Sequence, residues 1–439
     1  MKASFYFELV EQWFSSIKGK IEQKINGNKE AGKYLHEEVL TPEYTADLTW
    51  DSASVDDAVV AADVVALESP LPLKKRGSLG KASGTIVKTG MKKVLGETQI
   101  TKLNILQKLG KFVQLVAKLF DDAPKCALGI KERVEMMFLE AISTGFTVVG
   151  TTDGDVKAAG EEENTGTAVR VNFGFLKKNK YGVTIKWGQP GYTPVSDIKR
   201  VLDVIDSKIS VIWLRKESYN LLRTSQEAKE LYANYRSIPI MKDSILPTPT
   251  KDQFNEAFKD EYDVSFRLID REVVTEKNGK RKKVKPFDEH TLVFLPQDDN
   301  LGRVVYGELA EETNPVEGVK YEKVGEYILL SKYSKNDPLR EFTSAQALVL
   351  PVIDGVSEIY LLNTQEAQEV APGEIEGDPT IIVYENKYTK TDVINALKSC
   401  DVKCPSNISD AKLIEKINGL NDEDEEKVRK AIEALTPVE

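Results

Sequence analysis

Basic side chains are concentrated in one short stretch of an otherwise acidic chain. Residues 70–93, with the sequence PLPLKKRGSLGKASGTIVKTGMKK, carry seven lysines and arginines, four glycines and no acid, whereas the whole chain has a net charge of −10. Such a cationic segment can bind phosphate groups, an anionic membrane surface, or an acidic surface on another copy of the chain. The candidate contact residues are Lys74, Lys75, Arg76, Lys81, Lys88, Lys92 and Lys93.

Side chains suited to catalysis or metal binding are sparse. The chain has two histidines, and we expect both His36 and His290 to lie at the surface, because no serine or cysteine nucleophile accompanies them. Cys400 and Cys404 supply two thiols without a nearby histidine, which is half the ligand set of a zinc site. The phosphate-binding pattern G-x-x-x-x-G-K-[ST] does not occur. We therefore expect no enzymatic activity, no metal and no cofactor.

The composition is that of a soluble globular protein. The chain has 439 residues, of which 41% are hydrophobic and 30% charged, and this length predicts two or three compact units. Three cysteines are too few for a disulfide framework and favour a reducing compartment. No apolar run is long enough to span a membrane, and Glu8 and Glu11 interrupt the apolar N-terminal run, which argues against a secretory signal. The net negative charge disfavours non-specific nucleic-acid binding by the whole chain.

Patterns of apolar residues and glycines predict the elements that carry these side chains. Residues 1–40 predict a helix or a pair of helices, and the glycine-separated pieces of 70–93 predict a long β-hairpin. Residues 124–145 predict a long helix, because Pro124 opens it, Gly145 closes it, and apolar residues recur every three or four positions. The other expected elements are paired strands within 146–154 and 167–175, a helix at 193–208, a buried strand at 209–214, a helix at 217–236, short strands across 262–332 with a turn at Asn278–Gly279, and a strand pair around Asp354–Gly355.

Several stretches together resemble the lambda-type major capsid proteins of tailed bacteriophages, a family with the Hong Kong 97 fold. The clearest is DPLREFTSAQALVLPVID at 337–354. Residues 278–312 are similar to the family's succession of a turn, an apolar strand ending in proline, and a glycine-containing segment. VNFGF at 171–175, followed by the helix and the buried strand of 193–214, has the family's order of elements. The resemblance covers roughly residues 55–363.

The resemblance implies an α+β fold with a defined succession of parts. The expected parts are an N-terminal arm at 1–65, an extended β-hairpin loop at 66–104, a peripheral domain at 105–214 with its spine helix at 124–145, an axial domain at 215–330, and a return to the peripheral domain at 331–363. Beyond the resemblance, the polar stretch 364–385 predicts a linker, and 386–439 predicts a small C-terminal module of three short helices. That module is expected to decorate the exterior or to brace a neighbouring subunit.

The function implied by the resemblance is that of a shell subunit. Copies of the chain would assemble as hexamers and pentamers into an icosahedral shell around double-stranded DNA, in a virion made in the bacterial host cytoplasm. The chain itself would be the main partner, with portal, scaffold or decoration proteins and packaged DNA, bound without sequence specificity, as further partners and no membrane. We expect the seven basic residues of 70–93 to contact the neighbouring subunit, and Asp337, Arg340 and Glu341 to fix a turn by local ion pairing.

A competing interpretation is a soluble nucleic-acid-binding protein. The basic ribbon 70–93 and a second basic segment, KNGKRKKVK at 277–285, would then be its two binding patches. This alternative predicts an affinity for DNA that falls steeply with salt, because binding would depend on neutralising phosphates.

Overall fold

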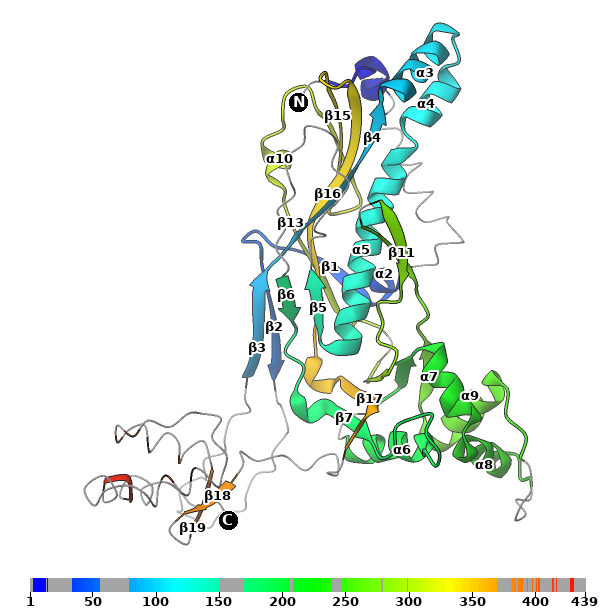
Figure 1. The fold of residues 1–439 in the computed structure, drawn as a ribbon, viewed down its shortest axis with the longest axis vertical. Helices are drawn as coiled ribbons and strands as arrows, with labels where there is room; N and C mark the ends of the chain where they lie inside the picture. Colours follow the sequence, from blue (N-terminus) through cyan, green and yellow to red (C-terminus); the bar gives the residue numbers. More distant parts are fainter. Residues whose placement is uncertain are drawn as a thin grey trace, which may run out of the picture. The chain divides into compact units, whose positions relative to one another are not determined.

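The computed structural model describes most of the chain. The described residues are 3–12, 14, 34–55, 79–149, 169–205, 208–238, 246–277, 279–297, 299–368, 380–383, 386–389 and single positions closer to the C-terminus. The chain divides into two compact units, 1–369 and 370–439. Helices and strands are mixed throughout the first unit, and the predicted α+β class is confirmed (Figure 1).

A six-stranded sheet is built around one long strand, β16 (Arg340–Ile353). Its first half pairs antiparallel with β4 (Lys88–Gly96) on one edge and with β15 (Ile328–Lys335) on the other. Its second half pairs with another strand of the sheet, β13. The remaining strands are β1 (Leu40–Tyr44), β13 (Gly302–Gly307) and β14 (Lys320–Val324).

One long helix, α5 (Asp122–Thr144), packs along this sheet (Figure 1). It has 23 residues, and the sequence prediction of a helix ending at Gly145 is confirmed: Gly145 has a φ of 84° and donates its N–H to the Ala141 carbonyl. The helix approaches β4 closely at Gly129, where an added Cβ would lie 2.1 Å from the Met91 sulfur. A glycine at this position therefore lets the helix and the strand share one tightly packed hydrophobic core, which we call the first core.

A second, five-stranded sheet separates the first core from a second core. Alternate side chains of its central strands face opposite ways: Trp213 and Val293 belong to the first core, whereas Ile212 and Phe294 belong to the second. This explains why the strand predicted at 209–214 is apolar at nearly every position, since both of its faces are buried. The strands, in order across the sheet, are β7 (Lys180–Val183), β17 (Tyr360–Ala367), β12 (Thr291–Leu295), β8 (Val211–Leu214) and β9 (Ser265–Leu268).

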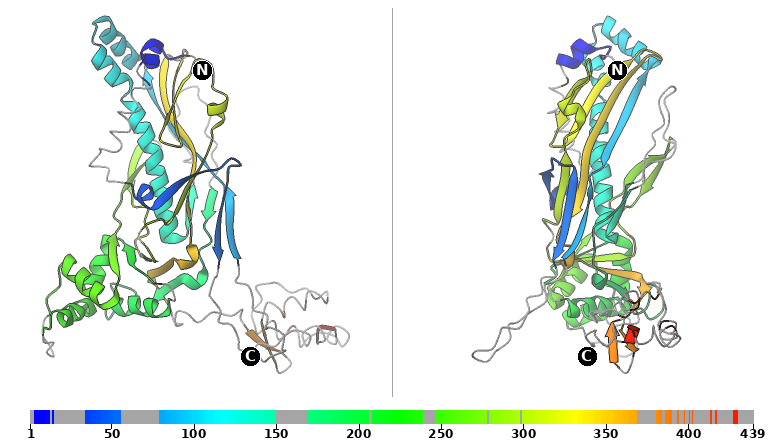
Figure 2. Two further views of the ribbon diagram at one scale, coloured as in Figure 1. Left: turned by 180° about the vertical axis from the view of Figure 1, so that it is seen from behind. Right: turned by 90° about the vertical axis from the view of Figure 1, so that its left-hand side faces the viewer.

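Helices cover the outer face of the five-stranded sheet and close the second core (Figure 2). An aromatic cluster of Tyr219, Phe254, Phe258 and Phe266 fills this core, with ring centroids 4.6–6.0 Å apart. The predicted helix at 217–236 is broken at Ser225, whose side chain accepts the N–H of Ala228 and so caps a new helix. The helices are α6 (Pro194–Val204), α7 (Lys216–Thr224), α8 (Gln226–Tyr235) and α9 (Lys251–Tyr262).

The remaining elements are short. The predicted strand pair following α5 is confirmed, and β10 and β11 pair on either side of the position of the predicted turn, where Lys277 lies opposite Lys280. The two-stranded sheets are β2 (Thr49–Val55) with β3 (Leu79–Thr85), β5 (Phe146–Val149) with β6 (Val169–Asn172), β10 (Val273–Lys277) with β11 (Lys280–Val284), and β18 (Thr380–Val383) with β19 (Asn386–Thr389). The short helices are α2 (Leu35–Val39), α3 (Glu97–Lys108), α4 (Phe112–Leu119), α10 (Ala310–Thr313), η1 (Lys177–Asn179) and η2 (Val356–Glu358).

Three predictions need correction at the level of elements. The strands flanking Asp354–Gly355 do not pair, because the turn at Gly355, with a φ of 62°, sends β17 into the other sheet. Only part of 66–104 forms a ribbon, since β4 is an integral strand of the six-stranded sheet and α3 begins at Glu97. The described parts of 1–40 contain only short helical pieces, at 7–12 with residue 14 and at α2, and β1 joins the six-stranded sheet.

The predicted domain boundaries also differ from the division between the two cores. Residues 180–214, expected in the peripheral domain, supply β7, α6 and β8 around the second core. In contrast, β13, β14 and the first three residues of β15, expected in the axial domain, belong to the sheet beside α5. In the second unit, β18 lies inside the expected linker, and β19 stands where a helical module was expected. Val393, Leu397, Leu413 and Val428 are buried helical positions of that unit.

Candidate functional site

The strands β2 and β3 form a ribbon that carries the cationic segment between them. The two strands pair antiparallel from Thr49–Thr85 to Val55–Leu79, and among the described residues they have no other strand partner. Trp50 anchors the base of the ribbon by packing its indole on Phe173, with ring centroids 5.4 Å apart. Gly84 lies against that indole, since an added Cβ would be 3.0 Å from its Nε1. The base is therefore fixed, and the 23 residues numbered 56–78 connect the far ends of the strands.

The seven predicted contact residues divide into two groups. Lys88, Lys92 and Lys93 lie on β4 and interact within their own chain: Lys88 is 4.0 Å from Glu311, Lys93 is 3.7 Å from Asp122, and Lys92 lies over the Phe342 ring. Lys81 lies on β3. The predictions for Lys74, Lys75 and Arg76 fall outside the described residues. Of the four described members of the set, the structure places only Lys81 on the ribbon.

The turn predicted at 337–341 connects β15 to β16 and contains a cis peptide bond between Asp337 and Pro338. Arg340 stands opposite Lys335 on β15 and Gly96 on β4. Glu341 does not serve in a local ion pair of this turn, because the alternation of the strand points its side chain into the protein, where it is fully buried.

The partners of Glu341 come from distant parts of the chain. Its carboxylate accepts a hydrogen bond from the Ser4 hydroxyl and another from the Phe5 N–H at 3.2 Å, and it lies 3.8 Å from the Lys332 ammonium. Lys332 also donates to Thr343 Oγ1 at 2.9 Å and to the Leu119 carbonyl at 3.2 Å. Burial lowers the pKa of Lys332 and raises the pKa of Glu341. The opposite charge of each partner acts against burial but does not outweigh it. This cluster attaches the N-terminal segment to the six-stranded sheet.

A second buried pair was not expected from the sequence. His36 was predicted to be a surface residue of a helix, but it is fully buried, and its Nδ1 lies 2.6 Å from Glu135 of α5. The same carboxylate accepts the N–H groups of Leu35 and His36, at 3.1 and 3.0 Å. Burial alone would raise the pKa of Glu135, but the hydrogen bonds and charge of His36, with the Leu35 N–H, outweigh burial and lower it. His290, in contrast, is exposed as predicted.

His36 borders a small pocket. The pocket has a volume of about 220 Å³ and lies where α2, β1, α5, β13 and the turn between β14 and β15 meet. Its lining is mainly apolar, and Lys131 and Glu37, which pair at 2.6 Å, stand beside it. The lining contains no hydroxyl or thiol nucleophile paired with His36, whose Nδ1 is already engaged with Glu135.

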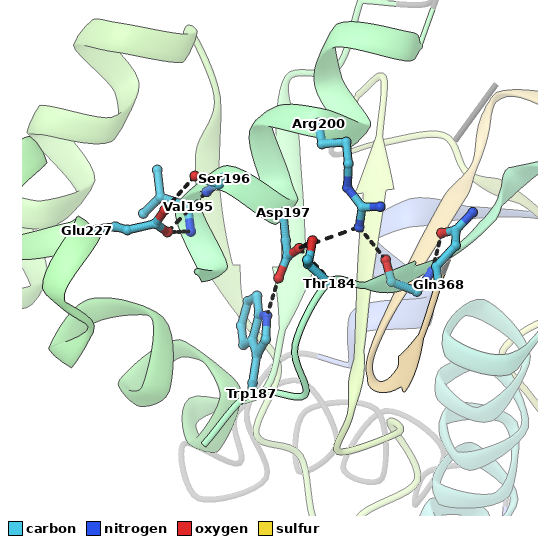
Figure 3. Close-up of polar contacts among 9 residues, drawn as sticks. Thr184, Trp187, Val195, Ser196, Asp197, Arg200, Glu227 and Gln368 are labelled. Carbon is cyan, nitrogen blue, oxygen red and sulfur yellow. Dashed lines mark hydrogen bonds and ion pairs between the residues drawn. The ribbon is translucent and has the colours of Figure 1, made fainter. Parts of the chain in front are cut away.

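The second core has its own buried carboxylate (Figure 3). Asp197 on α6 accepts hydrogen bonds from the Thr184 N–H and hydroxyl, both at 3.0 Å, and from Trp187 Nε1 at 3.1 Å. Arg200 Nη2 lies 3.4 Å from Asp197 and donates to the Gly182 carbonyl at 2.6 Å. Every donor therefore comes from the chain itself, which makes the cluster a brace between α6 and the end of β7.

Glu227 completes this brace from another helix. Its carboxylate accepts the N–H groups of Val195 and Ser196, at 2.7 and 3.1 Å, and the Ser196 hydroxyl. These N–H groups belong to the first turn of α6, where a helix leaves donors unpaired and carries partial positive charge. Figure 3 shows the two carboxylates on either side of that first turn. The sequence TPVSD at 193–197 is typical of a helix start and was the available signal for this site.

The described residues offer no metal site and no membrane span. Nowhere in them do three His, Cys, Asp or Glu side chains gather as a metal ion would require, and Cys400 is a free thiol. None of their helices is both long and apolar enough to cross a bilayer. Three of the six basic residues in the second patch of the competing interpretation are paired, because Arg281, Lys283 and Lys285 each lie within 3.0 Å of a carboxylate of the same chain.

Comparisons with known proteins find similarity in structure alone. No family model matches the chain, and no curated protein matches its sequence. A candidate prophage capsid protein of E. coli CFT073 is 14% identical, with a TM-score of 0.46, over 79% of this chain and 98% of that one. The mature capsid of bacteriophage PhiM1 is 7% identical, with a TM-score of 0.37, over 74% and 84%. The SrpI encapsulin of Synechococcus elongatus PCC 7942 is 10% identical, with a TM-score of 0.34, over 75% and 86%. Because these TM-scores are all below 0.5, the function proposed below rests on the geometry of the chain itself.

Proposed function

We propose that the chain is a major capsid protein with the Hong Kong 97 fold, whose copies assemble as hexamers and pentamers into an icosahedral shell. The observation that carries this proposal is the β2–β3 ribbon, which stands outside both large sheets and connects its strands through the cationic segment. An isolated two-stranded ribbon is marginally stable in water, so a ribbon of this kind needs a surface to rest on.

The other parts of the Hong Kong 97 fold can be assigned to elements of the first unit. The helix α5 serves as the spine helix, and the six-stranded sheet with α5 forms the peripheral domain. The five-stranded sheet with α6–α9 forms the axial domain, and β2–β3 with residues 56–78 forms the extended loop. The buried braces at Glu341 and Asp197 suit this role, because a subunit that transmits contacts across a shell must keep its own parts in fixed positions.

The ribbon contacts the neighbouring subunit through its basic residues. Lys74, Lys75, Arg76 and Lys81 face an acidic surface of that neighbour, which discourages one ribbon from pairing with another. Each exposed ion pair contributes only about 0–1 kcal/mol, so the charges set the register of the contact more than its strength. A contact between two different patches repeats from copy to copy and can close into a ring.

The remaining assignments concern the virion. The protein resides in the capsid, is made in the bacterial host cytoplasm, and performs no catalysis. It encloses double-stranded DNA without sequence specificity and contacts portal, scaffold or decoration proteins. The unit 370–439 decorates the exterior of the shell or braces a neighbouring subunit.

A charge-reversal experiment tests the proposal. We expect the triple substitution Lys74→Glu, Lys75→Glu and Arg76→Glu to abolish shells in sedimentation and negative-stain images while leaving the subunit folded. The matched control, Lys280→Glu, Arg281→Glu and Lys282→Glu, changes the charge equally on the exposed β10–β11 hairpin and should leave shells intact. Normal shells from the first variant contradict the role of the ribbon, and a wild-type protein that stays monomeric at high concentration contradicts the proposed function.

A further inference from the structure

The connection between α3 and α4 exposes a cluster of large apolar side chains. Ile105 is 51% exposed, Leu109 62%, Phe112 50% and Val113 85%. The opposite side of the same helical pair is buried, because Leu103, Leu115 and Leu119 belong to the first core. The α3–α4 hairpin therefore buries one apolar side in its own chain and exposes four large apolar side chains within nine residues. A group of exposed large apolar side chains is typical of a contact with another molecule.

Basic residues surround this tip. Lys102, Lys108, Lys111 and Lys118 are all exposed, and Glu97 is the only acid between residues 97 and 119. A surface with an apolar centre and a positively charged rim fits a partner with the opposite rim charge. An anionic partner that also offers apolar side chains is therefore required.

The chain carries such a surface at residues 308–317, around α10. This segment, ELAEETNPVE, contains four glutamates and no basic residue. Glu308 precedes α10 and Glu317 follows it, and both are exposed. Val316, between α10 and Glu317, is 39% exposed. The other two glutamates are partly engaged, Glu311 with Gln346 and Glu312 with Lys323.

The two surfaces cannot meet within one copy of the first unit. Figure 1 places the α3–α4 hairpin and α10 on opposite sides of the six-stranded sheet, and the view from behind in Figure 2 agrees. We propose that the apolar tip of α3–α4 docks on the acidic segment 308–317 of a second copy of the chain. Two different patches at opposite sides of one subunit make a head-to-tail contact, which each added copy can repeat. This inference rests on the proposed function and adds a contact that does not involve the ribbon.

Cysteine crosslinking tests the contact directly. One protein carries Val113→Cys, a second carries Val316→Cys, and the two are mixed and oxidised with oxidised glutathione. We expect a disulfide-linked dimer from the mixture on a denaturing gel, and a ladder of higher multimers from a chain with both substitutions. Replacing Val316→Cys by Val274→Cys, an exposed valine on the β10–β11 hairpin, provides a matched pair that should not crosslink.

A charge exchange tests the same contact without new thiols. We expect Glu308→Lys with Glu317→Lys to abolish shells, and the addition of Lys108→Glu with Lys111→Glu to restore them. All four residues are exposed, so the subunit should remain folded.

The outcomes separate the two hypotheses. If shells form but neither the crosslink nor the charge exchange behaves as expected, the docking inference fails while the proposed function stands. If residue 113 crosslinks instead within its own chain, the tip has an internal partner and the inference also fails. If the wild-type chain never assembles, the proposed function itself fails.

Discussion

The two cores of the first unit bury ionisable groups in different ways. The first core holds one oppositely charged pair, Lys332 with Glu341, and one hydrogen-bonded pair, His36 with Glu135. The partners of Glu341 include Ser4, 337 positions away. The second core holds one carboxylate, Asp197, whose donors lie within 13 positions in the sequence. The first arrangement ties distant segments together, whereas the second secures a single helix on the strand that precedes it.

This difference has an energetic consequence. A buried ion pair adds little net stability when both partners are present, but removal of one partner leaves an uncompensated charge and is strongly destabilising. Asp197 accepts mainly from neutral groups, the Thr184 N–H and hydroxyl and the Trp187 indole, and these donors would be unsatisfied without it. Removal of one partner of the Lys332–Glu341 pair should therefore cost more than removal of Asp197, and the loss should be recovered by a second substitution that removes the other charge.

Removal of Lys332 should have the largest effect. Lys332→Met leaves Glu341 buried without its cation, and we expect a loss of about 3–5 kcal/mol in the free energy of unfolding. Because burial already raises the pKa of Glu341, its neutral form is favoured at low pH, and stability is lost as pH rises through that raised pKa. Urea denaturation at pH 5 and pH 8 should therefore show the larger loss at pH 8.

The double variant Lys332→Met with Glu341→Gln is the control for this effect. It removes both charges and keeps a side-chain carbonyl to accept hydrogen bonds from Ser4 and Phe5. We expect it to recover most of the lost stability. A single variant as stable as wild type would contradict the assignment of a buried ion pair at this position.

Removal of Asp197 should have an intermediate effect. Asp197→Ala leaves the Trp187 indole N–H and the Thr184 groups without their acceptor, and we expect a loss of about 2–3 kcal/mol. Asp197→Asn keeps one acceptor oxygen and should cost about half as much by the same reasoning. Thermal unfolding followed by tryptophan fluorescence measures both variants, and equal losses from the two would show that hydrogen-bond acceptance is not what Asp197 supplies.

The pair of His36 and Glu135 should make stability depend on pH in the opposite sense to Glu341. The folded-state pKa of Glu135 is lowered below its ordinary value of 4.5, so its contribution is fully present above that pH and is lost as pH falls through the lowered pKa. We expect Glu135→Gln to cost about 1–2 kcal/mol at pH 7, from the buried hydrogen bonds that it weakens. The difference from wild type should shrink as the pH is lowered from 5 towards 3, and a difference independent of pH would contradict this.

The sequence predicted local features well and distant ones poorly. Pro124 and Gly145 mark the ends of α5 to within two residues, and the turn at 278–279 gives the β10–β11 hairpin, because these signals act through the backbone nearby. The burial of His36 depends on Glu135, 99 positions away, and no pattern around residue 36 reports it. The pairing of β17 with β12 rather than β16 likewise depends on tertiary packing beyond the turn at Gly355.

The same distinction explains which site residues were predicted. Glu341 was identified from a local motif and assigned to a turn, whereas its partners Ser4 and Lys332 approach it only in the folded chain. Asp197 was predicted to lie on a helix but not to accept four hydrogen bonds, although its place in the first turn of α6 follows from Pro194. Of the segment 70–93, the strand character was predictable, but the predicted hairpin was wrong, because β3 pairs with β2 and β4 pairs with β16. The incorporation of Lys88, Lys92 and Lys93 into a larger sheet was therefore not predictable.

Removal of an exposed ion pair should have the smallest effect on the free energy of unfolding. Arg281 and Glu276 face each other across the β10–β11 hairpin at 2.9 Å, and both side chains are more than half exposed. Water screens their attraction, so Arg281→Ala should change the free energy of unfolding by only about 0–1 kcal/mol. The same substitution at 0.5 M salt should have an even smaller effect, measured by urea denaturation. If this pair proved as important as Lys332 and Glu341, burial would not be the cause of the difference between them, and the contrast drawn between the two kinds of charged contact would fail.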